Sequence, residues 1–189
     1  MDQPLETRDA LPDALRVLLR YYPREGWQRD PNFHGLASMW LDRHLSFRRL
    51  LGLLRTDGEA LLDRRLDPQA WAPRLSRLGG HFVSDLHGHH HIEDDHYFPL
   101  LVQRDARLVQ GFDILDRDHK ALDGHLNAFV EDANAALRAL DDTAALRTGA
   151  GRFHAGLLRL EGFLDRHLTD EEELVVPVIL RDGPSAVGG

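Results

Sequence analysis

Leucine-rich segments with helical spacing dominate the chain, and their apolar residues recur every three or four positions. Leu50, Leu51 and Leu54 belong to one such segment, and Leu157 and Leu164 belong to another. No run alternates between apolar and polar residues as a half-buried strand would. The pattern therefore predicts an all-α protein. Because aromatic residues are few, the helices should be packed mainly by aliphatic side chains.

Breaks in this pattern separate four long segments. Asp30-Pro31-Asn32 precedes the first segment and Asp67-Pro68 ends it. Asp141-Asp142-Thr143 offers short polar side chains that can cap the start of the last one. The predicted helices run over about 33–64, 69–103, 106–140 and 143–174. Because short connections join antiparallel neighbours, we expect an up-down-up-down antiparallel four-helix bundle.

Three regions follow from these breaks. Residues 1–32 are expected to form an N-terminal arm that packs on the bundle and contains one short helix near Pro12–Tyr21. Residues 33–182 should form the four-helix bundle itself. Residues 183–189 should be a frayed tail, because they follow Asp182-Gly183-Pro184 and offer little to pack.

Charge and composition narrow the classes of function. The 189 residues include 23 basic and 31 acidic side chains, for a formal net charge of −8. This balance argues against nucleic acid or an anionic membrane as a partner, because both need a basic footprint. Without cysteine, neither a disulfide nor a thiolate metal site can form. The start of the chain does not resemble a signal peptide, so we expect a cytoplasmic protein.

Histidine is unusually frequent, with 12 residues, and part of it lies in an internal repeat. Two stretches share the pattern His-x-x-x-Glu followed six residues later by proline: His89, Glu93 and Pro99 in one, and His167, Glu171 and Pro177 in the other. A lone histidine lies upstream of each stretch, His44 before the first and His119 before the second. Each half of the chain is therefore interpreted as a helical hairpin that carries the same set of side chains.

The spacing of these histidines agrees with the predicted turns. In an up-down bundle, residues equally far from a turn lie at the same height. The midpoints between successive histidines fall near positions 66, 104 and 143, at or beside the three turns, for the set His44, His89, His119 and His167. We therefore expect one histidine from each helix at a single level of the bundle.

The two glutamates of the repeat share helix faces with their histidines. Residues four apart lie on one face of a helix, so Glu93 should follow His89 and Glu171 should follow His167. Buried carboxylates and imidazoles are costly unless they are paired or bind metal. The sequence therefore predicts a site for two cations, with mixed ligands that suit iron, manganese or zinc. Its predicted ligands are His44, His89, Glu93, His119, His167 and Glu171.

Other polar residues near this set have weaker claims. Asp123 follows His119 by four residues, and His96 follows Glu93 by three, so both are tentative ligands. His125 is a reserve ligand. His90 and His91 are interpreted as surface residues or as residues that lie behind the ligands.

These motifs together resemble those of the hemerythrin-like family, also called the histidine-histidine-glutamate cation-binding family. The resemblance covers roughly residues 33–180 and rests on His44, His89 with Glu93, His119, and His167 with Glu171. It implies a left-handed four-helix bundle in which the two carboxylates bridge two iron ions and the histidines cap them. It also implies an open position for oxygen or another small ligand.

Two features depart from the pattern of the oxygen carriers in that family. The last motif of the carriers places its carboxylate five residues after the histidine, where this chain has Glu172, but the repeat with Glu93 favours Glu171. The second departure is on the third helix. Those carriers have a second histidine four residues after the first on the third helix, where this chain has Asp123. Asp123 could serve as a carboxylate ligand, or the site could be one ligand short and more open. Either arrangement favours sensing or redox chemistry over reversible oxygen carriage.

Three functions follow as alternatives. The first is a non-haem di-iron protein that binds oxygen or a related small molecule for sensing, storage or carriage. The second is a di-iron oxidoreductase acting on peroxide, nitric oxide or iron. The third is an interaction bundle whose histidines respond to pH. The sequence leaves the oligomeric state open.

Overall fold

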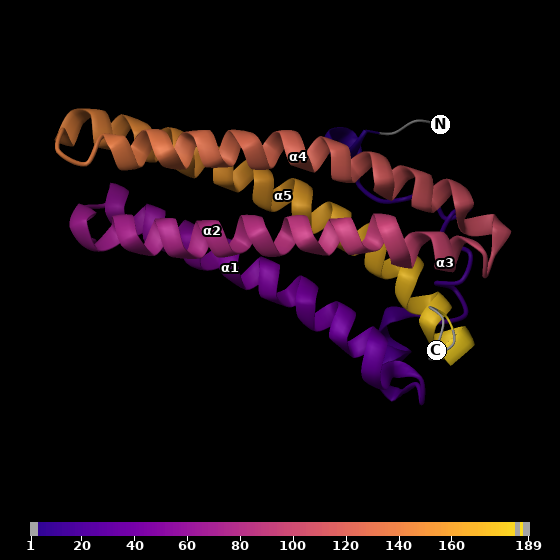
Figure 1. Cartoon of the computed structure of the whole chain (residues 1–189). Helices are drawn as coiled ribbons and strands as arrows, with labels where there is room; N and C mark the ends of the chain where they lie inside the picture. The colour runs from indigo at the N-terminus through magenta and orange to yellow at the C-terminus, as the bar shows by residue number, and fades with distance from the viewer. Residues whose placement is uncertain (1–3, 184–185, 187–189) are drawn as a thin grey trace. The chain divides into compact units, whose positions relative to one another are not determined.

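The computed structural model describes residues 4–183 and residue 186. Within these residues the chain is helical, without a strand, and four helices are long (Figure 1). They are α1 (Ser38–Leu62), α2 (Pro68–Ile92), α4 (Val109–Arg138) and α5 (Thr143–Asp182). The prediction of an all-α protein with four long helices, consistent with a hemerythrin-like bundle, is confirmed. The up-down-up-down order of these helices stays a prediction.

Shorter helical segments lie between and before the long helices. Two 3₁₀ helices, η1 (Leu5–Thr7) and η2 (Arg24–Arg29), lie in the N-terminal arm. A kinked segment, η3 (Phe33–Ala37), with non-helical backbone angles at His34 and Gly35, leads into α1. A π-helical turn, η4 (Glu93–Tyr97), and the short helix α3 (Phe98–Val102) continue from the end of α2, and the 3₁₀ helix η5 (Ala106–Leu108) precedes α4.

Polar side chains cap the starts of two long helices where the sequence predicted turns. The carboxylate of Asp142 accepts hydrogen bonds from the backbone N–H groups of Ala144 and Ala145, at 2.9 and 3.0 Å. That of Asp67 accepts one from the backbone N–H of Gln69 at 3.2 Å. These bonds satisfy amides that have no partner inside the helix, which places the starts of α5 and α2.

The contacts of the chain divide it into two compact units. Unit 1 comprises residues 1–45, 89–120 and 165–189, and unit 2 comprises residues 46–88 and 121–164. Each long helix contributes one stretch to each unit. The predicted boundaries between arm, bundle and tail rest on breaks along the sequence, whereas these two units rest on contacts in space. The predicted boundaries therefore stay a prediction.

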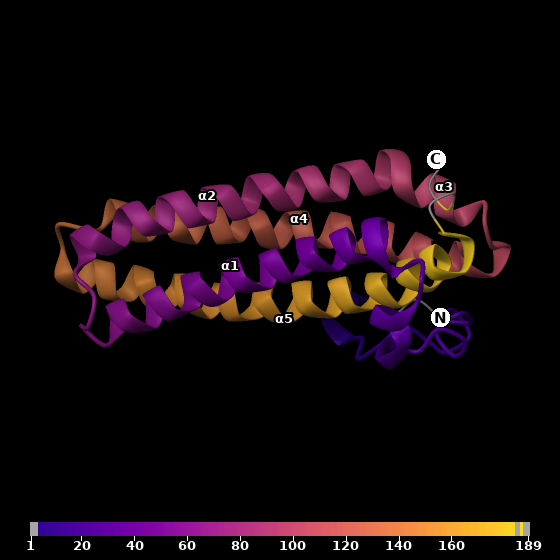
Figure 2. The ribbon, with the colours of Figure 1, turned by 90° about the horizontal axis from the view of Figure 1, so that it is seen from below.

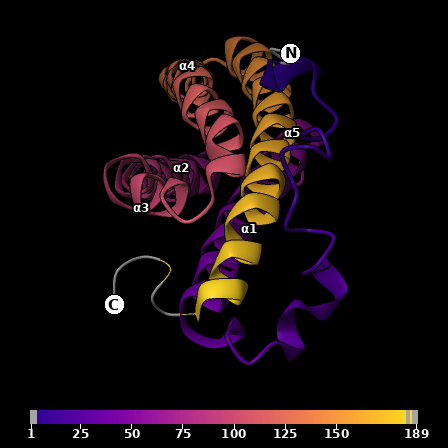
Figure 3. The ribbon, with the colours of Figure 1, turned by 90° about the vertical axis from the view of Figure 1, so that its right-hand side faces the viewer.

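The core of unit 1 joins the arm to residues of α1, α3, α4 and α5. Leu11, Leu18 and Trp27 of the arm are buried in the same apolar cluster as Phe112 of α4 and Val175 of α5. In Figure 3 the indigo arm runs beside the yellow end of α5. The arm therefore packs on its unit as an integral layer of the core.

The predicted helix near Pro12–Tyr21 is wrong. That stretch forms successive turns, in which the backbone N–H of Leu15 donates to Pro12 and that of Tyr21 donates to Leu18. The arm buries its leucines in the core of unit 1 while Tyr21 stays exposed. Tertiary contacts therefore replace the regular helix that local spacing favoured.

The core of unit 2 is built around aromatic rings. Phe82 packs edge-to-face on Phe47 and Phe129, and Phe153 packs on Phe129 and Trp71, with ring centroids 5.4–6.4 Å apart. These rings pack between the aliphatic side chains that the sequence led us to expect.

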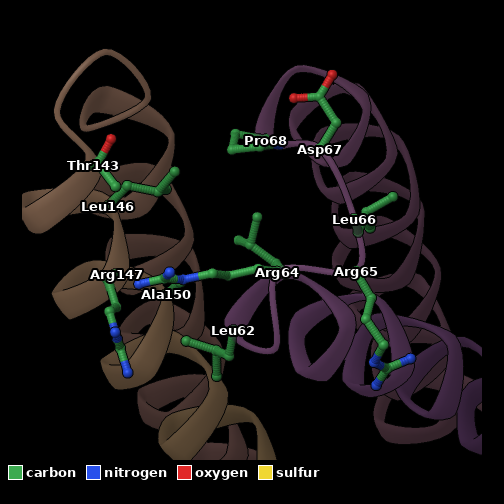
Figure 4. A pocket seen from close by; sticks show the side chains of 11 residues that line it. Leu62, Arg64, Arg65, Leu66, Asp67, Pro68, Thr143, Leu146, Arg147 and Ala150 are labelled. Carbon is green, nitrogen blue, oxygen red and sulfur yellow. The ribbon is translucent and has the colours of Figure 1, made fainter.

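A pocket of about 560 Å³ lies in unit 2 beside the α1–α2 and α4–α5 connections, which meet at one end of this unit in Figure 2. Figure 4 shows Arg64 extending across it toward Arg147 and Ala150 of α5. Arg64 has a left-handed backbone, with φ of 60°. None of the described lining residues is a histidine, so this pocket is unrelated to the predicted metal ligands.

The ends of the predicted helices needed two corrections. The second predicted helix is interrupted by η4, and the last one does not stop near residue 174 but continues to Asp182 through Pro177. A proline removes one backbone donor, which a long and well-packed helix can tolerate. Within the described residues, no helix is long and apolar enough to cross a membrane.

The predicted frayed tail lies largely outside the described residues. Of its members, Gly183 has a positive φ of 65° just after α5, where glycine is favoured. Ala186 is buried, and its carbonyl accepts a hydrogen bond from Nε of Arg104 at 3.1 Å.

Candidate metal centre

All six predicted ligands are buried in unit 1. They come from the four long helices and the π-helical turn η4, and none is more than 8% exposed: His44, His89, Glu93, His119, His167 and Glu171. Their positions at one place in the fold agree with the prediction that the repeat brings them together. The distances between their donor atoms indicate whether they can bind metal.

Four of these residues form what we call the first group: His44, His89, Glu93 and Glu171. Each offers a ligand atom, and these atoms all lie within 4.8 Å of one another. Nε2 of His44 lies 3.1 Å from Nε2 of His89 and 3.3 Å from Oε1 of Glu171. Nε2 of His89 lies 2.9 Å from Oε1 of Glu93. The spacing suits donors around a single cation.

A second group contains only histidines: His90, His119 and His167. Nε2 of His119 lies 3.1 Å from Nε2 of His167. The ring of His90 stacks on that of His119, with centroids 4.0 Å apart, and meets the ring of His167 edge-on at 5.4 Å. Three imidazoles at these distances could hold a second cation.

The two glutamates lie between the groups. Oε1 of Glu93 faces His89 of the first group, and its Oε2 lies 3.6 Å from Nε2 of His119 in the second. Glu171 repeats this arrangement, with Oε1 toward His44 and Oε2 3.6 Å from Nε2 of His167. Each carboxylate therefore presents one oxygen to each group, as a ligand shared by two cations would.

The groups leave buried polar atoms without hydrogen bonds. Both carboxylate oxygens of Glu93, Oε2 of Glu171 and both ring nitrogens of His90 are buried and make no hydrogen bond within the described residues. Burying such atoms unsatisfied costs about 1–3 kcal/mol each, and more for charged groups. The donor set fits a pair of cations, which would occupy the lone pairs that no protein donor reaches.

Burial and charge shift the pKa values of the two glutamates in opposite directions. Burial raises the pKa of Glu93 well above its usual range, and the nearby Glu171 raises it further. Burial also acts to raise the pKa of Glu171, but His44 outweighs it and holds that pKa well below its usual range. Glu93 is therefore the member of the pair that keeps a proton more readily, because two close carboxylates resist ionising together.

Most of the histidines are held neutral. Burial lowers the pKa of His89 to about 3, and it also lowers the pKa values of His90 and His167. His44 is the exception: burial acts to lower its pKa, but Glu171 and Glu172 outweigh this and raise it. Neutral imidazoles keep the lone pair that a metal ion needs.

Outer carboxylates contact the ring nitrogens that face away from the groups. Nδ1 of His44 lies 3.0 Å from Glu172, and Nδ1 of His119 lies 2.8 Å from Asp94. Nδ1 of His167 has a longer contact with Asp118, at 3.5 Å. A carboxylate at Nδ1 keeps the proton there and leaves Nε2 free to bind a metal.

The π-helical turn η4 sets the position of Glu93. The backbone N–H of Phe98 donates to the carbonyl of Glu93, five residues earlier, and Pro99 follows directly in α3. Such a widened turn is frequent at functional sites. The turn thus begins at Glu93, a residue of the site. The only sign of this turn in the sequence was Pro99, six residues after Glu93.

The tentative ligands fall outside both groups. Asp123 lies on the solvent face of α4 and His96 lies on the outer side of η4, and both side chains are exposed. The reserve ligand, His125, packs its ring on Phe163, with centroids 4.3 Å apart, and belongs to neither group.

Two residues of the site escaped the sequence analysis. His90, interpreted as a surface residue or one behind the ligands, is only 5% exposed and belongs to the second group. Its position three residues before Glu93, on the same helix face, was the available signal. Trp40 donates a hydrogen bond from its indole N–H to Oε1 of Glu171, which no sequence pattern indicated.

A helical fold that gathers buried histidines and glutamates in this way defines the class of helical cation-binding proteins. The family model of the hemerythrin HHE cation binding domain matches residues 35–179, and the chain belongs to this family. The resemblance found in the sequence is therefore confirmed. No curated protein and no solved structure matches the chain.

Proposed function

We propose that this protein binds two iron ions, one in each group, and that the pair takes up oxygen or a related small molecule for sensing, storage or carriage. The observation that carries the proposal is the placement of Glu93 and Glu171, each with one carboxylate oxygen toward each group. Mixed imidazole and carboxylate donors suit iron, and manganese or zinc are the alternatives.

The residues would divide the work as follows. His44 and His89 would hold the first ion, and the two glutamates would hold both ions. The second ion would also be held by three histidines: His90, His119 and His167. An iron pair supplies an electron-rich centre at which a small ligand can bind. The chain's own part is to hold the donors at fixed distances, to keep Nε2 of each histidine free and to exclude bulk water by burial.

The number of protein donors at each ion determines whether a small exogenous ligand can also bind. Because Asp123 is exposed, it does not fill the position of the carriers' additional histidine. With one oxygen from each glutamate, the first ion would have four protein donors and the second five, so an ion that takes six ligands would have room for a small exogenous ligand.

Metal content and optical titration test the proposal. Protein loaded with iron without oxygen should contain about two ions per chain. Addition of oxygen should then produce a new charge-transfer absorption. Two bound ions without any new absorption would contradict ligand uptake, and no bound metal would contradict the whole proposal. Turnover of peroxide or nitric oxide well above that of free iron would favour an oxidoreductase instead.

A further inference from the structure

Arginines of the N-terminal arm, here residues 4–32, contact acids on α4 and α5 of unit 1. Arg8 binds Asp118 and Asp170, Arg16 binds Glu173, and Arg24 binds Glu172. Two of these acids, Asp118 and Glu172, are the carboxylates that contact site histidines at Nδ1. The arm therefore reaches the site through one intermediate residue in two places.

The first connection runs from Arg24 to His44. Nη1 of Arg24 donates to Oε2 of Glu172 at 2.6 Å, and Oε1 of Glu172 lies 3.0 Å from Nδ1 of His44. Glu172 is almost completely buried, with 4% of its side chain exposed, whereas Arg24 is 41% exposed. The arginine thus holds one carboxylate oxygen while the other faces the histidine.

The second connection runs from Arg8 to His167. The guanidinium of Arg8 is fully buried and binds both oxygens of Asp118, and its Nε donates to Asp170 at 2.9 Å. The same Oδ2 of Asp118 lies 3.5 Å from Nδ1 of His167. A planar guanidinium suits this task because its donors form a rigid fork that can grip two carboxylates at once.

The physical effect of such a connection is orientation together with charge balance. A carboxylate behind a ligating histidine selects the tautomer and aims the ring. A buried carboxylate without a cation would be costly to ionise and free to change rotamer. An arginine that binds the carboxylate lowers the cost of its ionisation and fixes its rotamer. The histidine ring is therefore oriented for metal binding before the metal is bound.

We infer that the N-terminal arm is part of the metal centre, with Arg24 and Arg8 as positioning residues that act on His44 and His167 through Glu172 and Asp118. This inference rests on the proposed metal binding. It assigns a role to the arm, which lies outside residues 35–179, the range matched by the family model.

Arg16 offers a matched control for Arg24. Both arginines lie in the arm and both form an ion pair with Glu173, at 2.5 Å for Arg16 and 3.8 Å for Arg24. Glu173 contacts no site histidine in the ion pairs of the described residues. Arg24 differs because it also binds Glu172, which contacts His44. Substitution of either arginine by glutamine removes a contact between the arm and α5. Only the Arg24 variant should affect metal binding.

The experiment measures binding of Co²⁺ to the full chain by its visible spectrum. Arg24→Gln should weaken cobalt binding on the order of tenfold, as loss of support behind a ligand does. Arg16→Gln should bind as the wild type does. In a Glu172→Ala background, Arg24→Gln should cause no further loss, because the arginine acts through that carboxylate.

A second readout separates positioning from general stability. In the metal-free protein, the ¹⁵N shifts of the His44 ring should move toward a mixture of tautomers in Arg24→Gln and stay unchanged in Arg16→Gln. Arg8→Lys keeps the charge but loses the fork, and it should weaken cobalt binding if it folds. The Arg24 variant decides the question even if the Arg8 variant does not fold.

The outcomes distinguish failure of this inference from failure of the proposed function. Wild-type protein that binds no cobalt would overturn both. Wild-type protein that binds cobalt, with Arg24→Gln equal to Arg16→Gln in affinity and in histidine shifts, would overturn the role of the arm alone. Additive losses from Arg24→Gln and Glu172→Ala would also overturn it.

Discussion

The two units of the chain differ in what they bury. Within the described residues, twelve polar or charged side chains are buried, and eleven of them lie in unit 1. The exception in unit 2 is Asp57, which is paired with Arg74 at 2.7 and 2.8 Å. The interior of unit 2 is otherwise apolar and aromatic.

This difference separates two physical tasks. The apolar interior of unit 2 gains free energy from burial alone. Unit 1 buries carboxylates and imidazoles, which oppose folding unless partners or cations compensate them. We therefore expect unit 2 to supply stability without metal, and unit 1 to reach full stability only when its groups are occupied.

The largest expected effect comes from the aromatic core of unit 2. Phe153 is 1% exposed and contacts both Trp71 and Phe129. Phe153→Ala should lower the free energy of unfolding by about 3–5 kcal/mol, with and without metal, as measured by urea denaturation. Leu158→Ala is the control, since this exposed side chain should cost less than about 0.5 kcal/mol. A change in the metal content of the folded Phe153 variant would contradict the assignment of stability to unit 2 and of metal binding to unit 1.

The next effect concerns the histidine that the sequence analysis overlooked. His90→Ala should weaken binding of one of the two metal ions by about 100-fold, the upper end of the range for losing support at a metal site. The neighbouring His91, whose side chain is 74% exposed, provides the control. Metal analysis after dialysis should find one ion in His90→Ala and two in His91→Ala. Two tightly held ions in both variants would remove His90 from the second group.

A smaller effect is expected from pH. The pKa values of Glu93 and His44 are raised, so each group keeps its proton to a higher pH than usual, and a metal ion must displace any proton still bound. Metal affinity should therefore rise with pH, by about tenfold per unit for each proton released. Calorimetry in buffers of different ionisation enthalpy counts these protons, and a count of zero would contradict the assigned protonation.

The contribution of Glu93 to the stability of the metal-free protein should follow the opposite trend. A group with a raised folded pKa contributes stability below its unfolded pKa, and this contribution is lost as pH rises through the folded value. For Glu93 the loss begins above about pH 4.3, where an unfolded glutamate ionises. The lowered pKa values of His89, His90 and His167 act in the opposite sense. Glu93→Gln should therefore make the free energy of unfolding rise more steeply with pH than in the wild type, as measured by urea denaturation. An unchanged slope would argue against the raised pKa of Glu93.

The smallest effect is expected at Asp123. Because this side chain is exposed and lies in neither group, Asp123→Ala should change stability by less than about 0.5 kcal/mol and leave metal content unaltered. Loss of an ion in this variant would show that Asp123 serves the site after all.

Much of the fold and of the site was accessible from sequence because periodicity and spacing are local properties. Apolar periodicity predicted the four long helices, and the turns at Asp67 and Asp142 follow from short polar caps. The repeated His-x-x-x-Glu pattern placed two histidine-glutamate pairs on two helix faces. The equal heights of four histidines required only the positions of the turns.

What the sequence alone determined, then, is that four long helices form and that each repeated histidine shares a helix face with its glutamate. Only the tertiary structure decided how those side chains divide into two groups with Glu93 and Glu171 between them. It also decided that His90 faces inward, that Asp123 faces solvent, and that the arm sets Arg8 and Arg24 behind the site. These features depend on contacts between residues far apart in the chain, which helical spacing within one segment does not fix.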